Sequence, residues 1–227
     1  MIQLEGAGKT YEKRGQKIVA LAATNLNIAA GEFVAIVGPS GSGKTTLLSL
    51  LGGMLAPSAG KMLLDGVSVY DLPVHERAKL RQKRIGFVFQ TFNLIPYLSA
   101  LENVQIPLML SATDRKSQQE KAAELLTRLG LGERLDHKPG ELSLGQQQRV
   151  AMARTLANDP AIILADEPTG NLDPATRTQI LDYLTEFAKE GRTVVLVTHD
   201  MSAAELASRQ LLLKDGKITP RFAIHAA

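Results

Sequence analysis

The residues best placed to do chemistry form the run GPSGSGKT at residues 38 to 45. Glycines in such a turn let several backbone N–H groups converge on phosphate oxygens, and the N-terminus of a following helix adds partial positive charge. Lys44 can reach the β- and γ-phosphates, and Thr45 can offer its hydroxyl to Mg²⁺. The run therefore indicates a site for a nucleoside triphosphate with magnesium. The residues expected to contact it are Gly38, Pro39, Ser40, Gly41, Ser42, Gly43, Lys44, Thr45 and Thr46.

A pair of carboxylates could supply the second part of this chemistry. The run AIILADEP delivers Asp166 and Glu167 at the end of an apolar stretch, where an open parallel sheet places its reacting groups. Asp166 can hold magnesium through water, and Glu167 can polarise a water molecule for attack on the γ-phosphate. Adjacent carboxylates can also simply end a strand at the surface. Their presence beside a phosphate loop favours a nucleotide hydrolase over that simpler interpretation.

These side chains need a sheet to position them. The phosphate loop directly follows the apolar run FVAIV and precedes the helix-favouring run TTLLSLL, which argues against a glycine-rich turn without a ligand. Fully apolar runs are typical of buried parallel strands, and shorter β-rich runs fill the first third of the chain. This order indicates an α/β fold with antiparallel strands at its N-terminal edge. Strands are expected at KIVAL, NLNI, FVAIV, KMLLDG, IGFVF, AIILA and TVVLVT, with a closing hairpin about Asp215-Gly216. Helices are expected from Lys44, from about Val74, over 116–129, over 146–158 and from about Pro174.

Residues 91–155 differ from the β-type sequence around them. Pro96 and Pro107 bracket what we interpret as a connecting segment, and two stretches with helical spacing follow. We expect a helical subdomain at 91–155, inserted into an α/β core that is formed by residues 1–90 and 156–227.

Composition limits the possible functions. Of 227 residues, 44% are hydrophobic and 22% are charged, which is ordinary for a globular domain. The absence of cysteine excludes disulfides and thiolate metal sites and fits the cytosol. No stretch approaches the ~18 apolar residues of a membrane span, so we expect any membrane link to come through a partner. A net charge of +3 is too mild to argue for nucleic acid, and we expect no nucleic-acid partner.

One basic run interrupts this balanced charge. It is either a solvated helix face, the simpler interpretation, or a face turned toward anionic headgroups or an acidic partner. Its members are Arg77, Lys79, Arg81, Lys83 and Arg84.

The run LSLGQQQR at 142–149 resembles the signature loop of the ABC ATPases, whose usual form is LSGGQ. The continuation RVAMARTLANDPAIILADEPTGNLD resembles that family in order and spacing. So do Gln90 after IGFVF, Asp173 in the loop NLD, and His199 after TVVLVT. The resemblance covers nearly the whole chain. It implies an ATP-hydrolysing transporter subunit with a P-loop NTPase (RecA-like) core.

In that family two domains pair head to tail, and each ATP lies between the phosphate loop of one and the signature loop of the other. The resemblance implies that Ser143, Gly145 and Gln146 contact the nucleotide held by a second copy. A helix beginning near Gln146 would direct its dipole at the same anion. Position 144 holds a leucine where the family usually has a glycine. This difference puts the rate of ATP turnover in question, though not the binding of nucleotide.

The resemblance gives roles to four further residues. Gln90 would contact magnesium and the attacking water, and His199 would contact the γ-phosphate. Asp173 would communicate across the dimer, and Tyr11 would stack on adenine. Each has a simpler alternative, because Tyr11 can be an ordinary edge aromatic while Gln90 and His199 can merely end buried strands. The other histidines have no ligand spacing and are expected at the surface: His75, His137 and His225.

The segment 85–110 looks most like the subgroup that serves lipoprotein release and macrolide export. This resemblance implies a separate integral membrane permease and a location on the cytoplasmic face of the inner membrane. Phe92, Leu94 and Pro96 would line the groove that receives the permease's coupling helix, or form the core of the insertion. Two alternatives are a regulator of a membrane complex, as in cell division, and a soluble ABC ATPase acting on DNA or ribosomes. The second usually carries two cassettes or long coiled coils, and neither is seen here.

Overall fold

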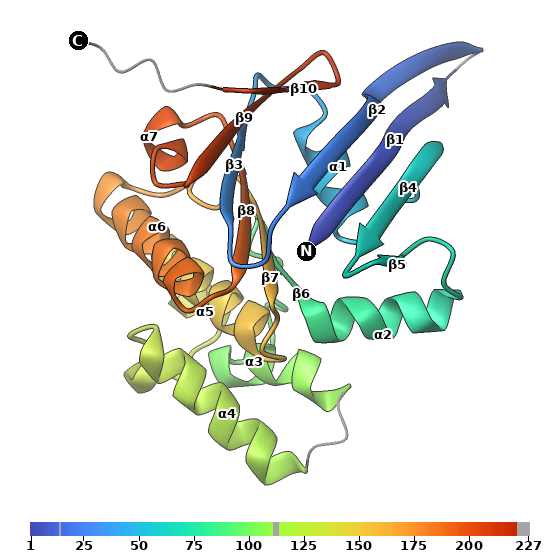
Figure 1. Cartoon of the computed structure of the whole chain (residues 1–227). Helices are drawn as coiled ribbons and strands as arrows, with labels where there is room; N and C mark the ends of the chain where they lie inside the picture. Colours follow the sequence, from blue (N-terminus) through green and yellow to red (C-terminus); the bar gives the residue numbers. More distant parts are fainter. Residues whose placement is uncertain (14, 111–113, 222–227) are drawn as a thin grey trace.

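The computed structural model describes residues 1–13, 15–110 and 114–221. Two sheets and a set of helices make up the fold (Figure 1). The first sheet is antiparallel, with strand order β2-β1-β4-β5. Its strands are β1 (Ile2–Lys13), β2 (Gln16–Ile28), β4 (Ala59–Leu64) and β5 (Val67–Ser68).

The second sheet carries the acidic pair and the strand before the phosphate loop. Its order is β10-β9-β3-β8-β7-β6, and every pair in it is parallel except β10 with β9. All residues of β3 and β8 are buried, as their apolar runs predict. Its strands are β3 (Phe33–Val37), β6 (Ile85–Val88), β7 (Ile162–Asp166), β8 (Thr193–Thr198), β9 (Arg209–Lys214) and β10 (Lys217–Pro220).

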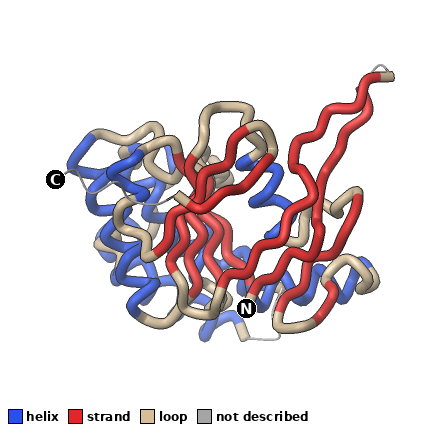
Figure 2. The backbone as a smooth tube through the Cα atoms, turned by 45° about the horizontal axis from the view of Figure 1, so that its top comes forward, coloured by secondary structure: helices blue, strands red, loops and turns tan. Residues whose placement is uncertain are grey.

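Helices cover both faces of the second sheet (Figure 2). Phe33 and Ile163 pack in one cluster with residues of α3 to α6, whereas Val34 and Ile162 pack in another with α1 and the antiparallel sheet. The alternation follows from the two-residue period of a strand. The helices are α1 (Lys44–Leu51), α2 (Val74–Arg84), α3 (Ala100–Met109), α4 (Arg115–Arg128), α5 (Leu144–Leu156), α6 (Pro174–Lys189) and α7 (Met201–Ala204), with single 3₁₀ turns η1 (Gly132–Arg134) and η2 (Pro139–Glu141).

The N-terminal strands differ from the sequence prediction. Strand β1 was not predicted, and KIVAL and NLNI form one long strand, β2, rather than two. Tyr11 therefore lies within β1, opposite Ile18, and not ahead of the first strand. Register shifts between Leu4 and Lys9 interrupt the alternation of apolar and polar residues, which is the signal that identifies a strand from sequence.

The segment between Pro96 and Pro107 also differs from the prediction, because it contains helix α3. Ser99 and Glu102 form a capping box at its start, with Ser99 Oγ accepting from Glu102 N and Glu102 Oε2 accepting from Ser99 N. Pro107 lies near the C-terminal end of the helix. Its ring lacks the N–H that would donate to Asn103 O, and the helix ends two residues later at Met109.

A buried asparagine fixes the loop that leads into α3. The Asn103 side chain is fully buried, accepts from Ile95 N and donates to the carbonyl oxygens of Ile95 and Leu98. Asn103→Ala would leave these partly buried backbone groups unpaired, so we expect it to lower the free energy of unfolding by roughly 2–4 kcal/mol. Urea unfolding measures this. The exposed substitution Gln119→Ala on α4 is the control, and an unchanged urea midpoint for Asn103→Ala would contradict the assigned role.

The basic run lies on α2 as predicted. The Arg77 guanidinium lies 5.4 Å from the centre of the Tyr70 ring, Arg81 donates to Gly53 O, and Arg84 pairs with Asp65. Lys79 Nζ also lies 3.7 Å from Glu76 Oε1, so neighbouring groups engage four of its five basic side chains, which favours the interpretation as a solvated helix face.

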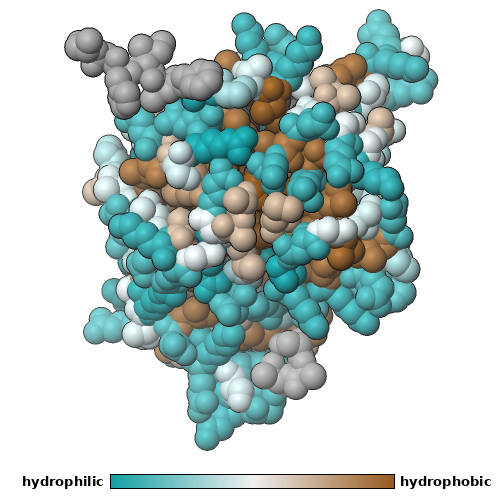
Figure 3. Space-filling view, viewed as in Figure 1, coloured by the Kyte–Doolittle hydropathy of each residue, from teal (hydrophilic) through white to brown (hydrophobic). Residues whose placement is uncertain are grey.

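The surface is mostly hydrophilic over α4, at the bottom of the space-filling view (Figure 3). None of the helices in the described part of the chain combines the length and the apolar character needed to cross a bilayer.

Candidate functional site: a phosphate-binding pocket

The phosphate loop connects β3 to α1 as predicted. Gly43 caps α1 with a φ of 105°, and a Cβ there would lie 2.2 Å from Ala20 O. Only glycine fits, because β2 presses directly against the loop at this point. The turn of the β9–β10 hairpin supports the other side, since Gly216 N donates to Ser42 O while Gly216 O accepts from Ala22 N. Contacts with β2 and with the β9–β10 turn therefore support the loop from two sides.

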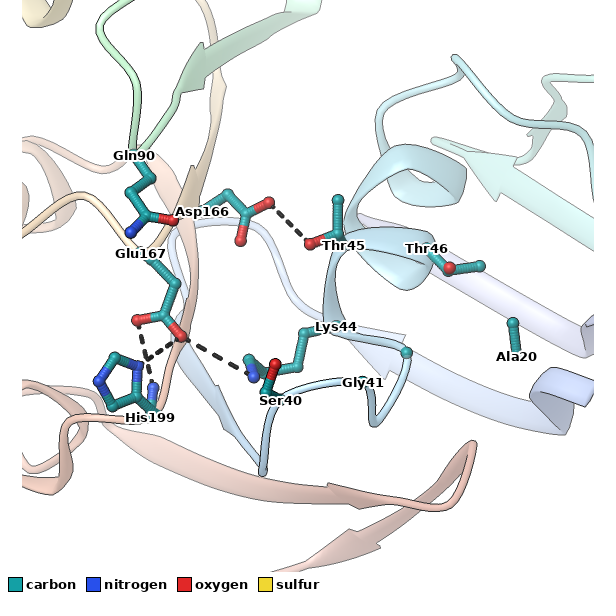
Figure 4. Close-up of a pocket in the computed structure, with 11 residues that line it drawn as sticks. Ala20, Ser40, Gly41, Lys44, Thr45, Thr46, Gln90, Asp166, Glu167 and His199 are labelled. Atoms are coloured by element: carbon teal, nitrogen blue, oxygen red, sulfur yellow. Dashed lines mark hydrogen bonds and ion pairs between the residues drawn. The ribbon is translucent and has the colours of Figure 1, made fainter. Parts of the chain in front are cut away.

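A cavity of about 620 Å³ opens beside this loop. The loop and the first turn of α1 contribute the predicted residues Ser40, Gly41, Gly43, Lys44, Thr45 and Thr46. The opposite wall is formed by Gln90, Asp166, Glu167 and His199, which come from the ends of β6, β7 and β8 (Figure 4). The fold thus brings both predicted motifs to one pocket.

Lys44 points into the loop. Its side chain is 10% exposed, and Nζ donates to Gly38 O at 2.8 Å and to Pro39 O at 3.1 Å. The same Nζ lies 3.8 Å from Glu167 Oε1. A cation in this position can neutralise phosphate charge and also faces the carboxylate expected to act on water.

Thr45 and Asp166 form a direct hydrogen bond, with Thr45 Oγ1 donating to Asp166 Oδ2 at 3.0 Å. Burial raises the pKa of Asp166, the neighbouring charge of Glu167 raises it further, and the Thr45 hydroxyl and the Lys44 charge oppose both effects. A hydroxyl, a carboxylate and the nearby Gln90 amide are hard oxygen donors of the kind that Mg²⁺ prefers. These three residues could therefore hold a magnesium ion.

Glu167 is the most constrained side chain in the pocket. Its Oε2 accepts from Thr198 Oγ1 at 3.0 Å. Oε2 also accepts from His199 N at 3.3 Å, and Oε1 lies 2.9 Å from His199 Nδ1 (Figure 4). Its φ of 45° is uncommon for a residue with a side chain, and such conformations cluster at functional sites. The carboxylate is thus held in one orientation at the edge of the cavity.

Two contributors to this pocket are missing from the residues predicted from the sequence. Thr198 orients Glu167, and Ala20 forms the wall beside the loop. Thr198 ends the apolar run TVVLVT one residue before His199, so the hydroxyl at a strand end was the available signal.

The residues of the signature run lie outside this pocket. Helix α5 begins at Leu144, two residues earlier than predicted, because Ser143 and Gln146 form a capping box that we had not identified. A Cβ on Gly145 would lie 2.4 Å from Thr176 Cγ2, so the N-terminal ends of α5 and α6 pack closely together. Asp173 caps α6 by accepting from Thr176 N, and hydrogen bonding from the Thr176 side chain first, then from this backbone N–H, lowers the pKa of Asp173.

The remaining candidates are also placed elsewhere. Tyr11 is 41% exposed on β1 and does not line the cavity, although Ala20 of the adjacent strand does. His75 is exposed as predicted, whereas His137 is partly buried, with its Nε2 3.2 Å from an Arg134 nitrogen. His225 lies outside the described residues.

A phosphate loop between a strand and a helix, faced by carboxylates at the end of a parallel strand, defines a P-loop nucleoside triphosphatase. Comparison with known proteins narrows this class. A family profile described as ABC transporter matches residues 21–170. The chain therefore belongs to the ABC transporter family as an ATP-binding cassette with ATPase chemistry, which confirms the resemblance and the fold class expected from the sequence.

Individual relatives agree with this assignment. An ABC transporter ATP-binding protein of Methanocaldococcus jannaschii is 49% identical over 96% of this chain and 95% of its own length. A solved structure of that protein, a dimeric post-hydrolysis state with ADP and Pi, has a TM-score of 0.90 and covers 97% of this chain and 98% of its own. The macrolide export ATP-binding/permease protein MacB of Syntrophobacter fumaroxidans is 48% identical over 97% of this chain, but the chain spans only 31% of its length.

Proposed function

We propose that this chain is the ATP-binding and ATP-hydrolysing subunit of an ABC transporter of the macrolide-export and lipoprotein-release type, driving a separate membrane permease. The observation that carries this proposal is the pocket in which the phosphate loop faces Asp166 and Glu167. The relatives named for macrolide export favour transport over the alternative role as a regulator of a membrane complex.

The roles in the pocket follow from the contacts within it. Lys44 and the loop amides bind the phosphates of ATP. Thr45, Gln90 and Asp166 would hold magnesium, which would supply charge neutralisation at the phosphates. Glu167 polarises the attacking water, and His199 orients Glu167 and contacts the γ-phosphate.

A second copy of the chain completes the site. Ser143, Gly145 and Gln146 do not line the chain's own cavity, so we propose that they contact the γ-phosphate held by the partner. The solved dimers of the Methanocaldococcus jannaschii relative support this arrangement. Asp173, beside the signature run, would lie at the same interface, and Tyr11 would stack on adenine from the β1–β2 hairpin.

The membrane subunit needs a separate docking surface. A groove of about 710 Å³ runs between α2, β6 and α3, with Phe87, Phe89 and Ile106 in its wall. We propose it as the permease site, and we propose a location on the cytoplasmic face of the inner membrane, which the relatives named as ATP-binding/permease proteins support. Phe92 and Leu94 instead pack against the helical core, their predicted alternative role. The exposed Pro96 does not line the groove.

The proposal of a shared site predicts how the rate depends on concentration. The purified chain should be mainly monomeric without nucleotide, and its specific activity should rise steeply with protein concentration, because each site needs Ser143 and Gly145 from a second copy. Steady-state assays of phosphate release from nanomolar to micromolar enzyme measure this. A rate strictly proportional to enzyme concentration over that range would contradict the shared site.

A further inference from the structure

A buried glutamine joins the signature helix to the pocket. Gln148 lies on the second turn of α5 and is 0% exposed. Its Nε2 donates to Pro168 O at 2.7 Å and to Phe89 O at 3.4 Å. Its Oε1 is buried without a hydrogen-bond partner among the described residues. Both partners are carbonyl oxygens, which only accept, so the amide nitrogen and not the oxygen must face them.

Each of these two carbonyl groups belongs to a residue next to a proposed functional side chain. Phe89 directly precedes Gln90, and Pro168 directly follows Glu167. One amide group thus bridges the backbone beside the proposed magnesium ligand and the backbone beside the proposed catalytic carboxylate. The bond to Pro168 O is the shorter and the stronger of the two by geometry.

Arg154, further along the same helix, holds the other side of the loop. Its two terminal nitrogens donate to Phe92 O at 2.7 Å and to Asn93 O at 2.6 Å. Gln90 therefore lies between two attachments to α5, one at Phe89 and one at Phe92. Any displacement of α5 must pull on the backbone at both ends of the segment that carries Gln90.

Packing alone does not account for a glutamine at position 148. A buried oxygen without a hydrogen-bond partner carries a desolvation cost that the side chain of leucine or methionine would avoid. We propose that Gln148 is a positioning residue. It fixes Gln90 relative to Glu167 and links both to α5, whose N-terminus is the signature run.

The consequence for turnover rests on the proposed function. When the partner's nucleotide engages Ser143 at one end of α5, the helix moves as a rigid rod, and Gln148 transmits its position to Gln90 in the chain's own pocket. Each chain would thereby align its own magnesium ligand only when its signature run is docked. The two sites of the dimer would be coupled through this helix.

Gln148→Met tests the role, because methionine keeps the length and volume of the side chain but donates no hydrogen bond. We expect near-native ATP affinity in the presence of magnesium and a kcat lower by roughly 10- to 100-fold, the scale of a displacement of about 1 Å at a reacting group. Native kcat in a folded Gln148→Met chain would overturn the proposal. If that chain does not fold, Gln148→Asn replaces it, since its shorter amide cannot reach both carbonyls and must also lose kcat.

Thr155→Val is the matched control. Thr155 Oγ1 donates from the same helix to Phe87 O at 2.6 Å, which lies on β6 three residues before Gln90. We expect Thr155→Val to lower the melting temperature while kcat stays within about twofold of native. If Thr155→Val lost as much kcat as Gln148→Met, then any contact that attaches α5 to the core would have the same effect. That result would overturn the proposal.

A double-mutant cycle with Gln90→Ala separates positioning from stability. If Gln148 acts by placing Gln90, then Gln148→Met should lower kcat far less in the Gln90→Ala background than in the native one. Losses of kcat that multiply independently would overturn the proposal. Failure of the proposed function would give a different result. The ATPase rate of the native chain would then be strictly proportional to enzyme concentration, and this would hold whatever residue occupies position 148.

Discussion

Glu167→Gln is expected to bind ATP normally and to hydrolyse it at least about 100-fold more slowly, the scale of losing a general base. Glutamine keeps the shape of the side chain, and its amide oxygen can still accept from Thr198 Oγ1 and His199 N. Its uncharged amide cannot take a proton from water. Titration calorimetry with ATP and a phosphate-release assay measure the two properties separately.

This variant should also change the oligomeric state. With ATP uncleaved, both γ-phosphates remain between phosphate loop and signature run, so Glu167→Gln should elute as a stable dimer with ATP and magnesium. Adding Ser143→Arg should abolish that dimer, because a bulky side chain would fill the space of the partner's phosphate. Glu133→Gln, on an exposed turn, is the control for loss of a carboxylate. Normal hydrolysis by Glu167→Gln would contradict the catalytic role of Glu167. A monomer in the presence of ATP would contradict the shared site.

The second large effect is expected from Lys44→Ala, which should abolish measurable nucleotide binding. Lys44 is the cation directed into the phosphate loop. Each charge-assisted hydrogen bond is worth about 1.5–3 kcal/mol, so losing the expected bonds to the β- and γ-phosphates weakens the affinity for ATP by roughly two orders of magnitude or more. Calorimetric titration with ATP and magnesium measures the loss.

Lys61→Ala provides the control for Lys44→Ala, because Lys61 is an exposed lysine on β4 that pairs only with Asp71 at 3.8 Å among the contacts described. It should bind ATP with native affinity. Near-native affinity in Lys44→Ala itself would remove the basis for assigning residues 38–45 to phosphate binding.

The phosphate loop and the acidic pair could be predicted from sequence because their chemistry is local. Gly43, Lys44 and Thr45 lie in consecutive positions between a strand and a helix, and Glu167 follows directly after a buried strand. Each apolar run of the second sheet was found where expected, since strands buried on both faces show no polar interruption.

What could not be predicted depends on contacts between distant segments. Gln148 reaches carbonyl oxygens 20 and 59 positions away, and nothing in the run QQQ distinguishes the buried glutamine from the two beside it. Helix α3 is not predicted because proline usually ends a helix, whereas here the helix continues through Pro107 to Met109. The start of α5 was placed late because Ser143 was considered for its contact with nucleotide and not as a helix cap.

The central strand of the larger sheet has a consequence for biosynthesis. Strand β3 pairs with β8 and β9, both of which lie near the other end of the chain, and the loop after β3 is held by Gly216. A growing chain on the ribosome therefore carries the bare apolar run FVAIV through most of its synthesis, with neither neighbouring strand yet made. Folding of this sheet must wait for nearly the whole polypeptide, and until then the run is a target for chaperones and a site of aggregation.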